Sequence, residues 1–106
     1  MHKSRHIQDN IAKKPDIDYF FLFKGFTIMV MQNGSNEVVD LPLNSIERWL
    51  NDQLFFRIHR SYLVNLRSIR ELRIRNKQLL IQMRGHELPV ARRKKKQLLD
   101  MLGMVN

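Results

Sequence analysis

The chain has 106 residues, of which 43% are hydrophobic and 27% charged, a composition that suits one folded domain and excludes a disordered chain. No apolar run approaches the roughly 18 residues of a membrane helix, and the polar first residues do not resemble a secretory signal. The absence of cysteine excludes disulfides and thiolate metal sites. We therefore expect a cytoplasmic protein that does not insert into a membrane.

The net charge of +9 is distributed unevenly along the chain. Residues 1–56 carry six Lys or Arg against seven acids, whereas residues 57–96 carry thirteen against two. Charge that served only solubility would not leave the first half nearly neutral. The basic block therefore predicts a polyanionic partner, and nucleic acid is the favoured one. An anionic membrane is the competing partner, but the final predicted helix uses its apolar residues for packing.

The first half predicts strands followed by a helix. Alternating and aromatic segments separated by Lys24-Gly25 and by residues 33–36 indicate strands over 17–23, 26–32 and 37–41. A helix is expected over 42–53, with Trp49 as a core anchor and with Asn44 and Glu47 as a capping box. Residues 1–16 are expected to form a linker or an N-terminal tail.

The second half predicts five more strands and a second helix. The strands are expected over 55–58, 62–64, 69–75, 78–83 and 87–90. The helix should run from Arg92 to Leu102, with Gly103 at its C-terminal cap. The expected fold is therefore mainly β, with small antiparallel sheets and two short flanking helices.

The segment FFRIHRSYLVN, from Phe55 to Asn65, places a polar and cationic turn between two apolar strands. The turn residues are His59, Arg60 and Ser61. An arginine on a projecting turn can give two hydrogen bonds to the O6 and N7 atoms of guanine in the major groove. Asn65 is expected to be a hydrogen-bonding residue at the bend after the second strand.

A second cationic segment, Arg92-Arg93-Lys94-Lys95-Lys96, is expected on the first turn of the final helix. Cations are unfavourable at the positive end of a helix dipole, so the pattern predicts bound phosphate there. Arg92 or Arg93 could also contact bases, with Lys94, Lys95 and Lys96 on the phosphate backbone.

Catalysis is not expected. The four histidines do not have metal-binding spacing, and the four glycines stand singly, so no phosphate loop or cofactor site is predicted.

The motif FFRIHRSYLVN, followed by LPVARR from Leu88 to Arg93, resembles the LytTR family of bacterial DNA-binding domains. The similarity covers residues 17 to 102. It implies an elongated stack of antiparallel sheets over residues 17–106 that reads DNA with loops. It also implies His59, Arg60 and Ser61 as contacts in one loop, and Arg92 and Arg93 in a second. The loop around Lys24 is a third expected contact.

The resemblance further implies dimers on direct repeats in promoters and control by a receiver domain of a two-component system, which does not fit within this chain. The chain could be an effector domain of a response regulator or a stand-alone regulator. Two positions depart from the family pattern: Ala91 stands where Ser is usual, and the loop FLFKGF replaces an acidic, Asn-containing stretch. The alternative function is a protein-interaction or inhibitor module of the same fold; general RNA binding is a further one.

Overall fold

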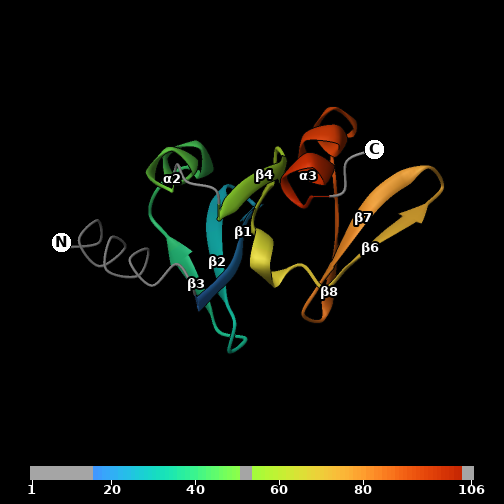
Figure 1. The fold of residues 1–106 in the computed structure, drawn as a ribbon. Helices are drawn as coiled ribbons and strands as arrows, with labels where there is room; N and C mark the ends of the chain where they lie inside the picture. Colours follow the sequence, from blue (N-terminus) through green and yellow to red (C-terminus); the bar gives the residue numbers. More distant parts are fainter. Residues whose placement is uncertain (1–15, 51–53, 104–106) are drawn as a thin grey trace.

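The computed structural model describes residues 16–50 and 54–103, which form two antiparallel sheets side by side along one axis (Figure 1). The molecule extends 48 × 25 × 24 Å. The prediction of a mainly β, elongated fold with two short helices is confirmed. The predicted tail over residues 1–16 lies, apart from Asp16, outside the described residues.

The first sheet has five strands in the order β3-β2-β1-β5-β4, and the second has three in the order β6-β7-β8. The strands of the first sheet are β1 (Ile17–Phe23), β2 (Phe26–Met31), β3 (Asn36–Val39), β4 (Phe55–His59) and β5 (Tyr62–Asn65). Those of the second are β6 (Glu71–Arg75), β7 (Gln78–Met83) and β8 (His86–Pro89). The helices are α2 (Leu43–Trp49) and α3 (Lys95–Met101), and two 3-10 turns are η2 (Leu66–Ser68) and η3 (Arg92–Lys94).

Helix α2 covers one face of the first sheet, and its packing corrects two sequence predictions. Leu43 and Ile46 are buried against the sheet, whereas Trp49 is 51% exposed and is not a core anchor. The helix begins after Pro42 without a side-chain cap, so the predicted capping box does not form. Trp49 is the last residue of a short helix, and the neighbouring side chain that packs into the core is that of Leu50.

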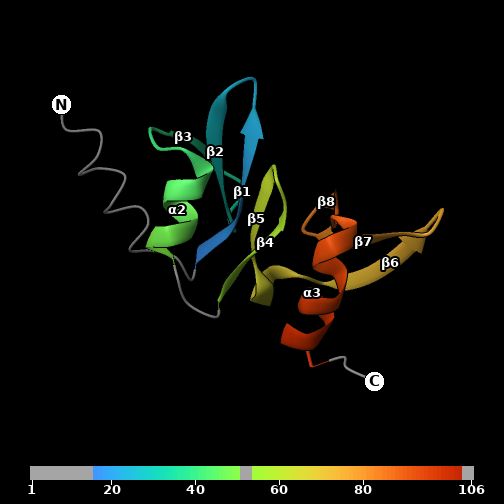
Figure 2. The ribbon, with the colours of Figure 1, turned by 90° about the horizontal axis from the view of Figure 1, so that it is seen from above.

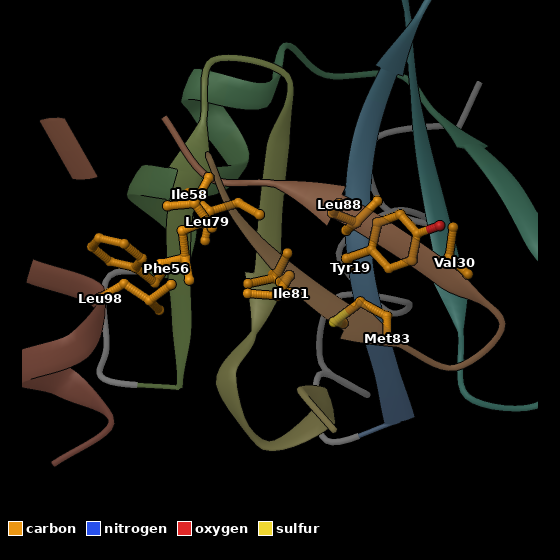
Figure 3. Close-up of a cluster of buried hydrophobic side chains, with 11 residues drawn as sticks. Tyr19, Val30, Phe56, Ile58, Leu79, Ile81, Met83, Leu88 and Leu98 are labelled. Carbon is orange, nitrogen blue, oxygen red and sulfur yellow. The ribbon is translucent and has the colours of Figure 1, made fainter. Parts of the chain in front are cut away.

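The second sheet packs on the opposite face of the first sheet through a continuous apolar cluster (Figure 3). The alternation of side chains along each strand supplies this cluster, because successive residues point to opposite faces. Helix α3 adds Leu98, which is fully buried. The labelled members are Tyr19, Val30, Phe56, Ile58, Leu79, Ile81, Met83, Leu88 and Leu98.

Polar contacts fix the sheets and the bends between them. Buried Asn65 donates from its side chain to the carbonyl of Ile17 at 2.9 Å and accepts from the backbone N–H of Arg67 at 2.9 Å. This confirms its predicted role at the bend. Arg84, in the β7–β8 turn, donates to the carbonyl of Gln32 at 2.8 Å and so connects the two sheets.

Candidate nucleic-acid interface

The β4–β5 turn presents the central residues of the FFRIHRSYLVN motif. The register passes from Arg57 opposite Leu63 to His59 opposite Tyr62, so one extra residue of β4, Ile58, forms a β-bulge just before the turn. Bulges change the direction of a strand and re-aim its side chains. Arg60 stands exposed at the tip.

His59 and Ser61 contribute to the shape of this turn. The Nδ1 atom of His59 accepts a hydrogen bond from the backbone N–H of Ser61 at 3.0 Å, and the imidazole lies 5.5 Å from the ring of Tyr62. Nδ1 is therefore used within the turn, and the Nε2 side of the ring is the part that can serve a ligand. The sequence had predicted His59 as a contact residue, and its structural part in the turn was missed.

Arg57, in strand β4, supports the turn in a way that the sequence prediction overlooked. It donates to the backbone carbonyls of His59 and Arg60, and on the other side to Asn44 and Glu47 of helix α2. Strand alternation contained the signal, because Phe55 and Arg57 share the face that α2 covers.

The second cationic segment lies directly beside the first turn. The backbone N–H of Ala91 donates to the carbonyl of Ile58 at 2.8 Å, and Val90 donates in the same way to Leu79 at 3.0 Å. The segment between β8 and α3 is thus held between the two sheets. Arg92 and Arg93 follow at once and are exposed.

The helical part of this segment corrects the sequence prediction. Residues Arg92–Lys94 form the 3-10 turn η3, and the α-helix begins only at Lys95. The predicted placement of all five cations on the first α-helical turn is therefore wrong, and the argument from the helix dipole does not apply to the first three. Ala91 caps η3 without a side-chain hydrogen bond, which agrees with the absence of the serine hydroxyl there.

Most of the candidate cations are not neutralised by acids. Within the described residues, Arg60, Arg92, Arg93 and Lys95 have no ion pair, whereas the Nζ of Lys96 lies 3.3 Å from the Asp100 carboxylate. Lys94 lies back over the ring of Phe56, with Nζ 5.4 Å from its centroid.

The arginines on β6 differ from these cations. Arg73 pairs with Glu71 at 2.9 Å, and Arg75 pairs with Glu87 at 2.8 Å. The hydrogen bond and charge of Glu71 raise the pKa of Arg73 above its ordinary value. A phosphate that bound Arg60, Arg92, Arg93 or Lys95 would thus not have to displace an acid. Among the described residues, Arg67, Arg70 and Lys77 are also exposed without an ion pair.

The Lys24 turn lies at the same end of the first sheet as the β4–β5 turn (Figure 2). The backbone N–H of Leu22 donates to the carbonyl of Ser61 at 3.1 Å, which joins the two turns. Lys24 itself has a positive φ of 49°, and its Nζ lies 5.3 Å above the ring of Phe23. The structure thus brings the first and third predicted loops together.

Lys77 is a further exposed cation that was not among the predicted contact residues. Asn76 and Lys77 both have positive φ and form the tight turn between β6 and β7. Lys77, Arg92 and Lys95 all line one groove of about 560 Å³. The cation-rich composition of residues 57–96 included Lys77, but only the folded chain shows that it shares a groove with Arg92.

The described part of the chain contains no group of three or more His, Asp or Glu residues that could hold a metal ion. A larger groove of about 740 Å³ lies between α2 and the β1–β2 hairpin, but its lining is mainly apolar, with Leu22, Phe26 and Val38. No described helix is long and apolar enough to cross a membrane.

Exposed cations without ion pairs on the turns of a described β scaffold are typical of nucleic-acid-binding proteins. The comparisons with known proteins agree with this class. Residues 11–103 match the family model of the LytTr DNA-binding domain. The chain belongs to the LytTR family of DNA-binding domains, and this membership supports DNA binding in regulation.

Two relatives extend the comparison. A response regulatory protein of Vibrio cholerae serotype O1, itself uncharacterized, is 29% identical over 94% of this chain. The match covers 54% of that protein, so the chain spans about half of its length. A solved LytTr DNA-binding domain from Bacillus cereus has the same fold, with a TM-score of 0.75 at 21% identity over 84% of this chain and 83% of that one.

Proposed function

We propose that this protein is a transcriptional regulator that binds double-stranded DNA sequence-specifically, with the turns at His59-Arg60 and Arg92-Arg93 in the major groove. One observation carries the proposal. The hydrogen bond from Ala91 to Ile58 holds two exposed, unpaired arginine segments side by side on a two-sheet core. Base reading needs side chains whose positions are fixed before binding, and a buried scaffold provides this.

The proposed roles follow from side-chain chemistry and exposure. Arg60 and Arg92 carry planar guanidinium groups that can bind guanine O6 and N7 together, so we assign them to bases. Arg93 serves either bases or phosphates. Lys95 and Lys96 bind phosphates as mobile point charges, with Lys94, Ser61 and Lys24 as supporting backbone contacts.

The proposal includes assembly and control. We propose that two copies bind direct repeats in a promoter and that a receiver domain governs this binding. The length of the Vibrio cholerae response regulatory protein, about twice that of this chain, is compatible with such an arrangement. Promoter binding in a bacterium would take place in the cytoplasm.

The decisive experiment is selection of bound duplexes from a random pool, followed by binding to the selected duplex across a salt series. We expect one sequence to be enriched, with log K falling linearly with log salt by about 0.9 per phosphate contacted. A pool that shows no enriched sequence would overturn the sequence-specific function. Binding to no duplex at all would favour the protein-interaction module instead.

A further inference from the structure

Arg57 lies one residue before the bulge in β4 and is almost enclosed, with 12% of its side chain exposed. Its Nε donates to the carbonyl of His59 at 3.0 Å, and its Nη2 donates to the carbonyl of Arg60. Its Nη1 donates to Asn44 Oδ1 at 2.9 Å and to Glu47 Oε1 at 2.8 Å. One guanidinium therefore joins two carbonyls of the turn to two side chains of α2.

We infer that Arg57 is a positioning residue that sets the base preference of Arg60 by holding the β4–β5 turn against helix α2. The inference rests on the proposed function and adds a residue to it. A guanidinium has five N–H donors in a rigid plane, and four acceptors are engaged here. Arg57 is therefore committed to the protein and has little left to offer DNA directly.

The β4–β5 turn needs the hydrogen bonds of Arg57 because the backbone pairing of β4 with β5 is interrupted just before the turn. The bulge at Ile58 breaks the regular pairing of β4 with β5, and the Ile58 carbonyl is bonded to Ala91 instead. The carbonyls of His59 and Arg60 fix the main chain from which the Arg60 side chain projects. A misplacement of about 1 Å is enough to spoil a positioned contact.

The hydrogen bonds of Arg57 to helix α2 connect the position of that helix to the β4–β5 turn. Asn44 and Glu47 lie on the first turns of that helix, and their oxygens complete the Arg57 environment. A change in the position of α2 would be passed to the turn through a single side chain. The specificity of the first loop therefore depends on a helix that contributes none of the proposed DNA contacts.

The test compares Arg57→Lys with the parent protein on the selected duplex and on a shuffled duplex. Lysine keeps the charge but cannot span four acceptors. We expect the ratio of the two affinities to fall at least tenfold, while affinity for the shuffled duplex and the salt slope stay unchanged. The matched control is Arg75→Lys, which changes an arginine paired with Glu87 outside the turn and should leave the ratio unaltered.

A double-mutant cycle separates positioning from general stability. If Arg57 acts through Arg60, Arg57→Lys should cost little when Arg60 is already alanine. Losses that simply add would contradict the inference. If Arg57→Lys and the parent protein discriminate equally between the selected and the shuffled duplex, the inference about Arg57 is also contradicted. The proposed function is a separate matter, because it fails only if the parent protein itself shows no preference between the duplexes.

A measurement without DNA completes the test. The N–H of Ser61 bonds to His59 within the turn, so its hydrogen exchange reports the turn's order. Arg57→Lys should speed this exchange about tenfold while the β6–β7 hairpin is unchanged; unchanged exchange would overturn the inference. If Arg57→Lys does not fold, Asn44→Ala and Glu47→Ala carry the test, since each removes one acceptor of the Arg57 guanidinium and should lower the affinity ratio several-fold.

Discussion

The backbone N–H of Ala91 lies 2.8 Å from the carbonyl oxygen of Ile58, and this hydrogen bond joins the two cationic segments of the protein. Ile58 lies at the bulge of β4, which is an edge strand of the first sheet. Ile58 and Val90, on either side of the bond, are buried in the cluster between the sheets. The spacing of Arg60 and Arg92 is therefore a property of the core and not of two independent loops.

Ala91 also caps the 3-10 turn η3, with φ −61° and ψ 141° but without a side-chain hydrogen bond. A hydroxyl here could accept from a free backbone N–H of η3, so Ala91→Ser should raise the free energy of unfolding by about 0.5–1 kcal/mol. Urea denaturation measures the change. The comparison of Ala91→Thr with Ala91→Val, in which a methyl group stands in place of the hydroxyl, tests the effect of the hydroxyl at similar shape. Equal stability of the two would argue against capping.

Arg60→Ala and Arg92→Ala should each weaken binding to the selected duplex by about 1–3 kcal/mol and relax preference at a different base pair. The reason is the loss of a bidentate hydrogen bond to one base. Fluorescence anisotropy with singly substituted duplexes measures both effects. Uniform weakening across all duplexes would reassign the residue to the phosphate backbone.

Lys95→Ala and Lys77→Ala should weaken binding to all duplexes alike and lower the salt slope by roughly one unit each. Both residues line the same groove with Arg92 and have no acid partner among the described residues. The control is Arg48→Gln, on helix α2 and outside the proposed interface, which should leave the slope unchanged. If Lys77→Ala behaves like this control, the DNA does not reach the β6–β7 turn.

Burial in the core, together with the nearby charges of Tyr62 and Asp18, raises the pKa of Tyr19 to about 12. In the unfolded chain the phenol loses its proton near pH 10, whereas the folded protein keeps it. The contribution of Tyr19 to the free energy of unfolding is therefore fully present below about pH 10. It falls by up to about 1.4 kcal/mol per pH unit until about pH 12. Between about pH 10 and pH 12 the Tyr19→Phe variant should become more stable relative to the parent protein, as measured by the free energy of unfolding. A difference that stays constant over this range would contradict the raised pKa of Tyr19.

The strands and the first loop were predictable from the sequence because their signals are local. Alternating apolar residues and the turns at Lys24-Gly25 and Asn76-Lys77 determine the hairpins. The apolar flanks of the motif likewise placed Arg60 at an exposed turn. Asn65 was assigned correctly because a buried amide at a bend needs partners in the main chain.

Features that depend on tertiary contacts were not predictable in the same way. Helical spacing suggested Trp49 as a core residue, but α2 ends there and leaves the ring half exposed. Asn44 and Glu47 fit the pattern of a capping box, yet their oxygens bind Arg57 from a strand distant in sequence. Net charge likewise could not show which cations were already paired with acids, as Arg73 and Arg75 are.

In the proposed complex, the turns carrying Arg60 and Arg92 enter the major groove of DNA. Methylation protection by dimethyl sulfate tests it most directly, because the reagent modifies guanine N7 in the major groove and adenine N3 in the minor groove. On the selected duplex the parent should protect guanine N7 positions, and Arg60→Ala should expose one of them while leaving the others protected. Protection confined to adenine N3, or guanines that stay fully reactive in the bound complex, would contradict the account.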